Sequence, residues 1–207
     1  ISSARMIMDS PNISSTAAVP LSSSSFILRT YYDPLKQNIL TKLTLHKPYF
    51  QFGTGILRKQ VDGIFCTDGT LLLNREFNRI MYVYTYRNQF ICLDSNLKIL
   101  YQARTIDTNT VAKIQVTEIK AKNQTVLSSA ALTVNRLSCV SGDQLYINSA
   151  LKANNEAVPD FNRYAVIDVY DTRNGSYKFS FYVVKDHEHP ISSLLASRNM
   201  LFLIQGN

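Results

Sequence analysis

Two kinds of β-hairpin alternate along the chain, and this repeat restricts the fold more than any other feature of the sequence. The first kind is an apolar strand that ends at an aspartate, a short polar turn, and a second apolar strand. An Asp side chain at that position can accept hydrogen bonds from backbone N–H groups two residues further on and so start a turn. The copies lie at 26–43, 89–103 and 164–181, with their aspartates at Asp33, Asp94 and Asp171.

The second kind of hairpin is a strand, a polar turn and a more strongly apolar strand, and it occurs at 70–86, 132–151 and 191–207. The two kinds follow one another, so they pair into repeated four-stranded antiparallel units. Such a repeat is typical of the blades of a β-propeller, and we predict an all-β fold of this architecture. A β-sandwich of short strands is the alternative.

The repeat predicts one propeller portion over residues 1–207, with an incomplete ring. Propellers close with about four to eight blades, so we expect the rest of the same polypeptide or another chain to complete it. Residues 1–25 are rich in serine and predict a loop with at most one short strand, at 4–8, whereas 108–130 should add a strand or two. The predicted parts are a half blade at about 26–48, blades at about 64–107 and 131–185, and a half blade at about 191–207.

Residues 80–86, with the sequence IMYVYTY, alternate with the period of two that is typical of a strand. Met81 and Val83 should point to one face, and Ile80, Tyr82, Tyr84 and Tyr86 to the other. Because both sets are apolar or aromatic, we expect other sheets to cover both faces of this strand. Its tyrosine hydroxyls should then find hydrogen-bond partners.

Composition excludes several classes of protein. Hydrophobic residues make up 45% and charged residues 18% of the 207, which excludes a disordered chain. No apolar run reaches the roughly 18 residues of a transmembrane helix. The net charge is +7, but its lysines and arginines are scattered, which argues against nucleic acid as a partner. Cys66, Cys92 and Cys139 lack the close spacing of zinc or redox motifs, and we predict that they are buried core residues.

The segment 57–108 resembles a family of envelope proteins of Bacteroidota that are described as six-bladed-propeller-like and have no established activity. The matching stretches are KQVDGIFCTDG, YVYTYRNQF and LDSNLKILYQARTIDT, followed later by ALKANNE, IDVYD and YKFSFYV. The resemblance covers roughly residues 26–207. It implies a longer protein, exported or lipid-anchored in the cell envelope, and it transfers no catalytic residues.

Polar loops are the candidate binding sites. The turn between two strands at 87–89 and the loop at 152–163 should lie at one rim of the propeller, where they would form a polar surface for a protein, a peptide or a glycan. A purely structural role, as caps of strand ends, is the alternative. The candidate binding residues are Arg87, Asn88, Gln89, Asn154, Asn155 and Glu156.

Two other groups contain residue types that can carry chemistry. His187 and His189 lie two residues apart and could reach one cation from a strand, but they precede a proline in an expected loop, so we predict no metal. Asp62 and Asp68 are each followed by glycine, which indicates turns in which Gly permits a positive φ rather than an acid–base pair. We predict no catalytic residues and no cofactor.

The function expected from the sequence is a non-enzymatic binding or scaffold module of the bacterial cell envelope. The alternative is a propeller hydrolase or lyase whose active site lies in the central channel and is completed by further blades. A deep pocket with convergent carboxylates or histidines would favour the enzyme.

Overall fold

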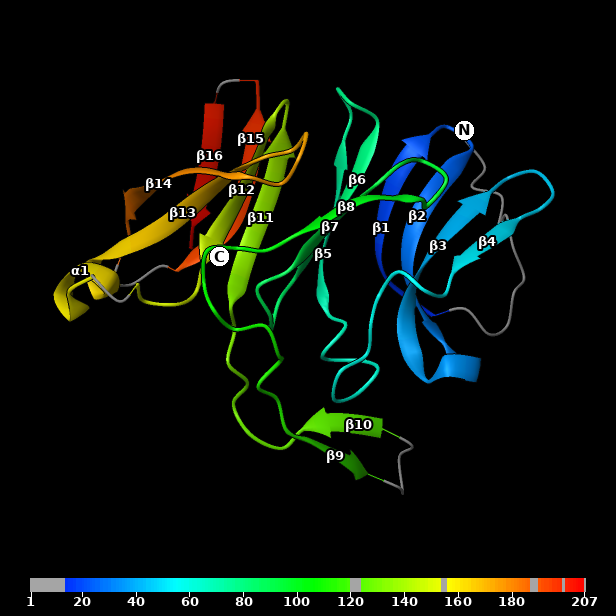
Figure 1. Cartoon of the computed structure of the whole chain (residues 1–207), viewed down its shortest axis with the longest axis horizontal. Helices are drawn as coiled ribbons and strands as arrows, with labels where there is room; N and C mark the ends of the chain where they lie inside the picture. Colours follow the sequence, from blue (N-terminus) through cyan, green and yellow to red (C-terminus); the bar gives the residue numbers. More distant parts are fainter. Residues whose placement is uncertain (1–13, 120–123, 154–155, 187–189, 199, 207) are drawn as a thin grey trace.

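The computed structural model describes residues 14–119, 124–153, 156–186, 190–198 and 200–206. The fold is all-β, with three four-stranded and two two-stranded antiparallel sheets (Figure 1). The first sheet contains β1 (Ser15–Ser22), β2 (Ser25–Tyr32), β3 (Gln37–Thr44) and β4 (Phe50–Gly53). The second contains β5 (Gly69–Asn74), β6 (Arg79–Tyr84), β7 (Phe90–Leu93) and β8 (Ile99–Ala103). The third contains β11 (Asn135–Ser141), β12 (Gln144–Ser149), β13 (Tyr164–Asp171) and β14 (Tyr177–Val184).

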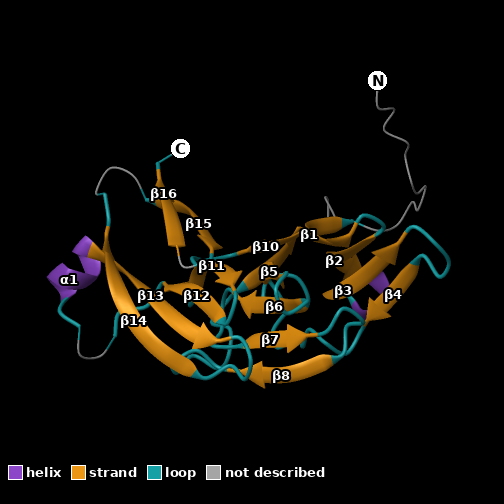
Figure 2. Ribbon diagram, turned by 90° about the horizontal axis from the view of Figure 1, so that it is seen from above, coloured by secondary structure: helices purple, strands orange, loops and turns teal. Residues whose placement is uncertain are grey.

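The two-stranded sheets are β9 (Val116–Ile119) with β10 (Gln124–Leu127), and β15 (Ile191–Ser197) with β16 (Met200–Gln205). Consecutive strands pair in every sheet, so the order of the strands in space is their order in the sequence. First strands of neighbouring sheets are in contact: β1 with β5, β5 with β11, and β11 with β15. The last strands β4, β8 and β14 lie on the outer side, so the sheets fan out around the first strands (Figure 2).

Apolar side chains fill the spaces between neighbouring sheets, and β6 contributes to two of these spaces. Ile80, Tyr82 and Tyr84 pack against the first sheet, whereas Met81 and Val83 pack against the third. The predicted alternation is confirmed at residues 80–84, because these five side chains are at most 1% exposed. Tyr86 lies beyond the end of β6 and packs in another cluster, that of Cys66 and Ala112. A further cluster joins the third sheet to β15 and β16 through Ile167, Val169, Leu194, Leu201 and Leu203.

The buried tyrosine hydroxyls of β6 have partners, as predicted. Tyr82 donates a hydrogen bond to the carbonyl of Thr67 (2.5 Å), and the backbone N–H of Arg58 lies 3.4 Å from the hydroxyl of Tyr84. The two rings contact each other edge to face, with centroids 5.2 Å apart. Burial raises the pKa of both phenols, so they stay neutral donors at ordinary pH. They fill space in the core.

The three repeated aspartates all lie at turns. One carboxylate oxygen of Asp94 accepts hydrogen bonds from the N–H groups of Asn96 (2.8 Å) and Lys98 (2.9 Å). Asp171 accepts one from Arg173 (2.8 Å), again two residues on. Asp33 instead begins a short 3₁₀ turn, and its carboxylate pairs with the ammonium of Lys36. The expected side-chain turn chemistry is confirmed at Asp94 and Asp171.

The segments 1–25 and 152–163 differ from expectation. The described part of 1–25 is no loop, because β1 spans Ser15–Ser22 and pairs with β2; the expected strand at 4–8 lies outside the described residues. The strands β1 and β4 extend the β2–β3 hairpin to a four-stranded sheet, where the sequence predicted a half blade at 26–48. Its Pro20 is compatible with an edge strand. A short helix, α1 (Val158–Arg163), also forms in the expected loop 152–163.

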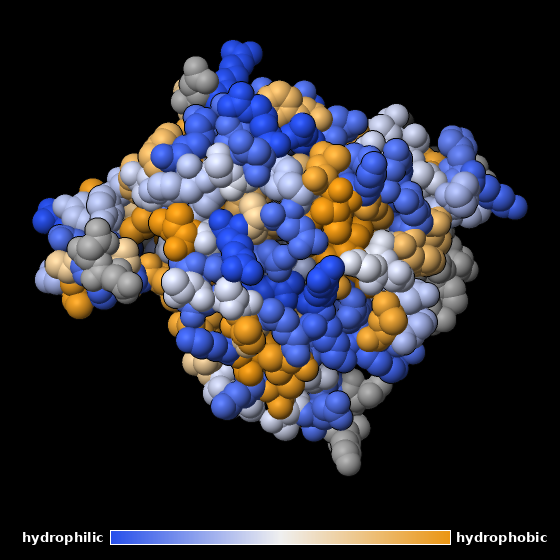
Figure 3. Space-filling model, viewed as in Figure 1, coloured by the Kyte–Doolittle hydropathy of each residue, from blue (hydrophilic) through white to orange (hydrophobic). Residues whose placement is uncertain are grey.

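All three cysteines are free and buried, as expected for core residues. Within the described residues, no helix is long and apolar enough to cross a membrane. On the face drawn in Figure 3, apolar side chains lie in separate patches between hydrophilic ones. This face therefore offers no single large apolar surface.

Leu93 and Leu100 allow a matched test of the packing between sheets. Leu93 in β7 is fully buried between the first two sheets, whereas Leu100 in β8 is 45% exposed. We expect Leu93→Ala to lower the free energy of unfolding by about 2–5 kcal/mol, because it leaves a cavity, and Leu100→Ala to lower it by less than about 1 kcal/mol. Urea denaturation measures both. Equal losses would contradict the packing.

Candidate functional site

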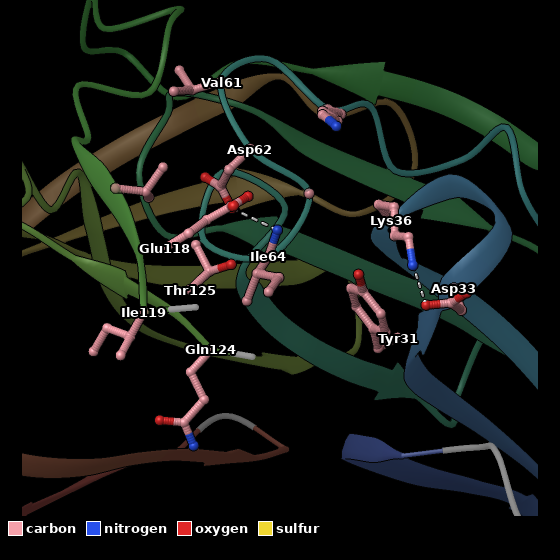
Figure 4. A pocket seen from close by; sticks show the side chains of 13 residues that line it. Tyr31, Asp33, Lys36, Val61, Asp62, Ile64, Glu118, Ile119, Gln124 and Thr125 are labelled. Carbon is pink, nitrogen blue, oxygen red and sulfur yellow. Dashed lines mark hydrogen bonds and ion pairs between the residues drawn. The ribbon is translucent and has the colours of Figure 1, made fainter. Parts of the chain in front are cut away.

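A polar cleft of about 710 Å³ lies between the first sheet and the β9–β10 hairpin. Three segments line it: the turn that joins β2 to β3, the loop at 59–64, and both strands of the hairpin. Figure 4 shows Tyr31 and Lys36 on one side of the cleft, and Glu118 and Thr125 on the other. Because the three segments are distant in sequence, the cleft exists only in the folded protein.

Asp62 folds the loop that forms the middle wall. Its carboxylate accepts hydrogen bonds from three successive backbone N–H groups, those of Ile64 (2.6 Å), Phe65 (2.6 Å) and Cys66 (3.1 Å). The Cys66 thiol donates in turn to the carbonyl of Asp62. This arrangement is the turn predicted from the sequence, and it commits the carboxylate to structure rather than to acid–base chemistry.

Gly63 allows this loop to lie directly against the first sheet, because a side chain at this position would collide with the backbone of Lys36 and Gln37. Gly63 does not have a positive φ, contrary to the expected reason for a glycine here. A Cβ atom at this position would lie 1.8 Å from the carbonyl oxygen of Lys36 and 2.6 Å from the Cα of Gln37. The close approach permits a hydrogen bond from the N–H of Asn38 to the carbonyl of Gly63 (2.7 Å).

Two buried amide side chains continue this attachment. Gln37 donates from Nε2 to the carbonyl of Leu57 (2.9 Å), and Asn38 donates from Nδ2 to the carbonyl of Ile64 (3.0 Å). Both residues come from the start of β3 and are buried. They fix the wall of the cleft to a rigid strand.

Gln60 attaches the opposite wall. Its Oε1 accepts a hydrogen bond from the N–H of Ala112 (2.9 Å), and its Nε2 donates to the carbonyl of Thr110 (3.0 Å). At the base of the hairpin, a small apolar cluster of Cys66, Ala112 and Ile114 packs against Val116 and Leu127. The hairpin is therefore held at its base, while its strands border the cleft (Figure 4).

Three of the charged groups of the cleft are committed to contacts within the protein. The carboxylate of Asp33 pairs with the ammonium of Lys36 at 2.5 Å, and both side chains are mostly exposed. Their contact raises the pKa of Lys36. Asp62 is occupied by backbone N–H groups, while Tyr31 and Gln124 present polar ends to the cleft (Figure 4). The arrangement can hydrogen-bond a polar ligand.

Arg87 lies inside the protein rather than on the predicted polar surface. It is 1% exposed, and its guanidinium lies 3.6 Å above the centroid of the Tyr84 ring. Nη1 donates to the carbonyl of Arg58 (3.0 Å), whereas Nε and Nη2 have no hydrogen-bond partner among the described residues. The side chain is held by a cation–π contact, which the sequence pattern could not specify.

Asn88 is also buried, and it organises the segment that follows β8. Its N–H donates to the carbonyl of Asn109 (2.8 Å), its Nδ2 to the carbonyl of Asp107 (2.6 Å), and its carbonyl accepts from Thr105 (3.2 Å). Gln89 is half-buried and donates to the Gln102 side chain (3.1 Å). The turn 87–89 therefore positions neighbouring segments.

The second predicted group is described only at Glu156, because Asn154 and Asn155 lie outside the described residues. Glu156 is 7% exposed. Its Oε2 accepts a hydrogen bond from the N–H of Ala153 (3.2 Å), whereas Oε1 has no partner among the described residues. Glu156 is therefore a buried side chain with one acceptor oxygen to spare, rather than part of an exposed polar surface.

The candidate metal ligands His187 and His189 also lie outside the described residues. In the described parts of the chain, no group of three or more His, Cys, Asp or Glu side chains could hold a metal ion. The sequence pattern did not predict the cleft itself, apart from Asp62. The sequence pointed to the cleft only indirectly, because the extra strands expected at 108–130 form the β9–β10 hairpin that borders it.

Comparison with known proteins assigns no family. No family model matches the chain, and no curated protein matches it. A solved structure of a DUF4221 family member from Bacteroides vulgatus is similar, with 11% sequence identity and a TM-score of 0.49. The alignment covers 90% of this chain but only 56% of that one. At this TM-score the similarity supports no conclusion about function.

Asp62 and Asp33 provide a test of how the cleft wall is held. We expect Asp62→Ala to lower the free energy of unfolding by about 1.5–3 kcal/mol, the range for hydrogen bonds to a charged group. Amide hydrogen exchange at Ile64, Phe65 and Cys66 should also become faster. Asp33→Ala, which removes an exposed carboxylate of the same cleft, should change neither quantity measurably. Unchanged exchange in Asp62→Ala would show that the carboxylate does not hold the loop.

Proposed function

We propose that the sheets are blades of a β-propeller. Support comes from the strand order within each sheet and from the contacts between first strands. It also comes from the second sheet, which is covered on one face by the first sheet and on the other by the third. A β-sandwich has two sheets and buries one face of each, so the three-layer packing favours the propeller.

The exposed apolar face of the β15–β16 sheet favours the presence of a further sheet that packs on it. One of its faces packs on the third sheet, whereas Leu195, Phe202 and Ile204 on the other face are 47–55% exposed. In a propeller, such a face is covered by the next blade. We propose that the rest of the same polypeptide or another chain supplies that blade.

The proposed function is a non-enzymatic binding or scaffold module that holds a polar partner, a peptide or a glycan, in the cleft. The observation that carries this proposal is the cleft of about 710 Å³, lined by hydrogen-bonding groups such as Tyr31 and Gln124. Small-molecule sites occupy cavities of about this size. Location in the bacterial cell envelope rests on the sequence resemblance alone.

A hydrolase or lyase is the alternative function. Such an enzyme needs an acid and a base that converge on one point. In the cleft, Asp33 is paired with Lys36, and Asp62 accepts three backbone hydrogen bonds, which leaves Glu118 as the acidic lining residue without such a contact among the described residues. These commitments favour binding over catalysis.

The cleft is tested by screening the protein against immobilised peptides and bacterial oligosaccharides, followed by calorimetric titration of the strongest hit. Tyr31→Phe removes one hydroxyl and Gln124→Ala one amide, and we expect each to weaken binding by about 2- to 10-fold, the loss of one hydrogen bond. Tyr49→Phe, at an exposed tyrosine outside the cleft, is the matched control. Equal affinities in all variants would exclude the cleft as the binding site. Turnover of the ligand during titration would favour the enzyme.

A further inference from the structure

A second cavity, of about 470 Å³, lies between the second and third sheets. One wall is the segment Ile106–Asn109, which follows β8. The other is formed by β13, β14 and the loop after β12. Neither the cleft nor the hairpin contributes to this cavity, so a ligand bound here would be independent of the function proposed for the cleft.

A buried carboxylate forms part of the cavity lining. Asp168 in β13 is 3% exposed, and it points to the face of the third sheet that packs on the second, as Tyr170 does two residues on. Ser180 donates a hydrogen bond to its Oδ1 (2.6 Å), and Ser180 is linked to the hydroxyl of Tyr177 (2.8 Å). No second donor among the described residues reaches this carboxylate.

The surroundings of this carboxylate compensate only part of its negative charge. Burial, and to a smaller extent the neighbouring Asp107, raises the pKa of Asp168, while the hydrogen bond from Ser180 lowers it. Asp107 stands on the opposite wall, where its carboxylate accepts from the N–H of Asn109 (2.8 Å) and the hydroxyl of Thr105. Lys152 also lines the cavity, but its ammonium donates to the carbonyls of Ala153 and Glu156 (3.0 Å each) rather than to Asp168.

Aromatic side chains border the same cavity, and a second buried carboxylate lies close to one of them. Tyr177 and Tyr182 line it and are 45% and 57% exposed. The Glu156 carboxylate lies close to Tyr182 and contributes, after burial, to raising the pKa of that phenol. Carboxylates and tyrosine rings thus border the same cavity.

Two of the residues expected to form a rim surface, Asn88 and Glu156, form hydrogen bonds with residues that line this cavity. Asn88 holds the carbonyls of Asp107 and Asn109, and Glu156 holds the N–H of Ala153. Asp107, Asn109 and Ala153 are lining residues. Asn88 and Glu156 therefore each position a segment that lines the cavity.

We propose that this cavity binds an ammonium group, such as a lysine side chain of a partner or a small primary amine. An ammonium group would add hydrogen-bond donors to the single one, Ser180, that the described residues supply to Asp168, and it would neutralise the desolvated charge. Tyrosine faces add a cation–π attraction. An anion would be repelled by Asp107 and Asp168, and a neutral polyol would leave the buried charge uncompensated.

The test is an NMR titration of the ¹⁵N-labelled protein with Nα-acetyl-lysine methylamide. We expect saturable shifts of the amides at 106–109 and 177–182 rather than of those around the cleft. The norleucine analogue, which has the same chain without the ammonium group, should produce no saturable shifts. Methyl glucoside and inorganic phosphate test a polyol and an anion. Stronger binding of either of these than of the lysine probe, or no saturable binding of the lysine probe, would overturn the proposal.

Two variants locate the binding residues. Asp168→Asn keeps the shape but removes the charge, and we expect it to weaken binding of the lysine probe at least tenfold. Tyr182→Ala, at an exposed ring, should weaken it by roughly two- to fivefold, as expected for an exposed cation–π contact, and it keeps the test decisive should Asp168→Asn not fold. Asp143→Asn removes an exposed carboxylate from the same sheet and controls for net charge. Loss of affinity in Asp143→Asn equal to that in the other variants would refute binding in the cavity.

Discussion

The structure depends on the burial of both faces of the second sheet. A sheet that exposes one face to water can alternate apolar and polar residues, but a sheet between two others has to be apolar on both faces. This condition is met by β6, where adjacent residues Ile80 and Met81 belong to different clusters. The first and third sheets then need no direct contact with each other to be held in one domain, because each packs on the second.

Polar contacts at the strand ends fix how the sheets are oriented. Between the first and second sheets, Arg29 forms an ion pair with Asp68 and donates to the carbonyl of Gly69 (2.8 Å). Between the second and third, Arg79 and Tyr101 both donate to the carbonyl of Thr172 (3.0 and 2.7 Å). Since the cleft and the second cavity lie beside sheets held in this way, their walls are rigid except for the loops and the hairpin.

Much of the fold follows from local patterns, whereas the sites do not. The period of two predicts both faces of β6, and turn chemistry predicts the roles of Asp94 and Asp171, because these depend on near neighbours in sequence. The strand β1 has the sequence STAAVPLS, in which Thr16 and Val19 are outnumbered by serine, alanine and proline, and its pairing with β2 overrides this weak preference. Residue type places Arg87 at the surface, because arginine is seldom buried. Its burial is explained by a local contact with the Tyr84 ring together with a tertiary one, the hydrogen bond to the carbonyl of Arg58.

The three buried cysteines have a consequence for the conditions under which the chain can fold. Burial raises the pKa of Cys92, and that of Cys139 to about 12, so these thiols hardly form the thiolate that reacts with oxidants and other disulfides. Cys66 is only 1% exposed. The folded state therefore neither requires an oxidant nor offers one a target. Once the protein has folded, thiol reagents should therefore act on it only after it unfolds.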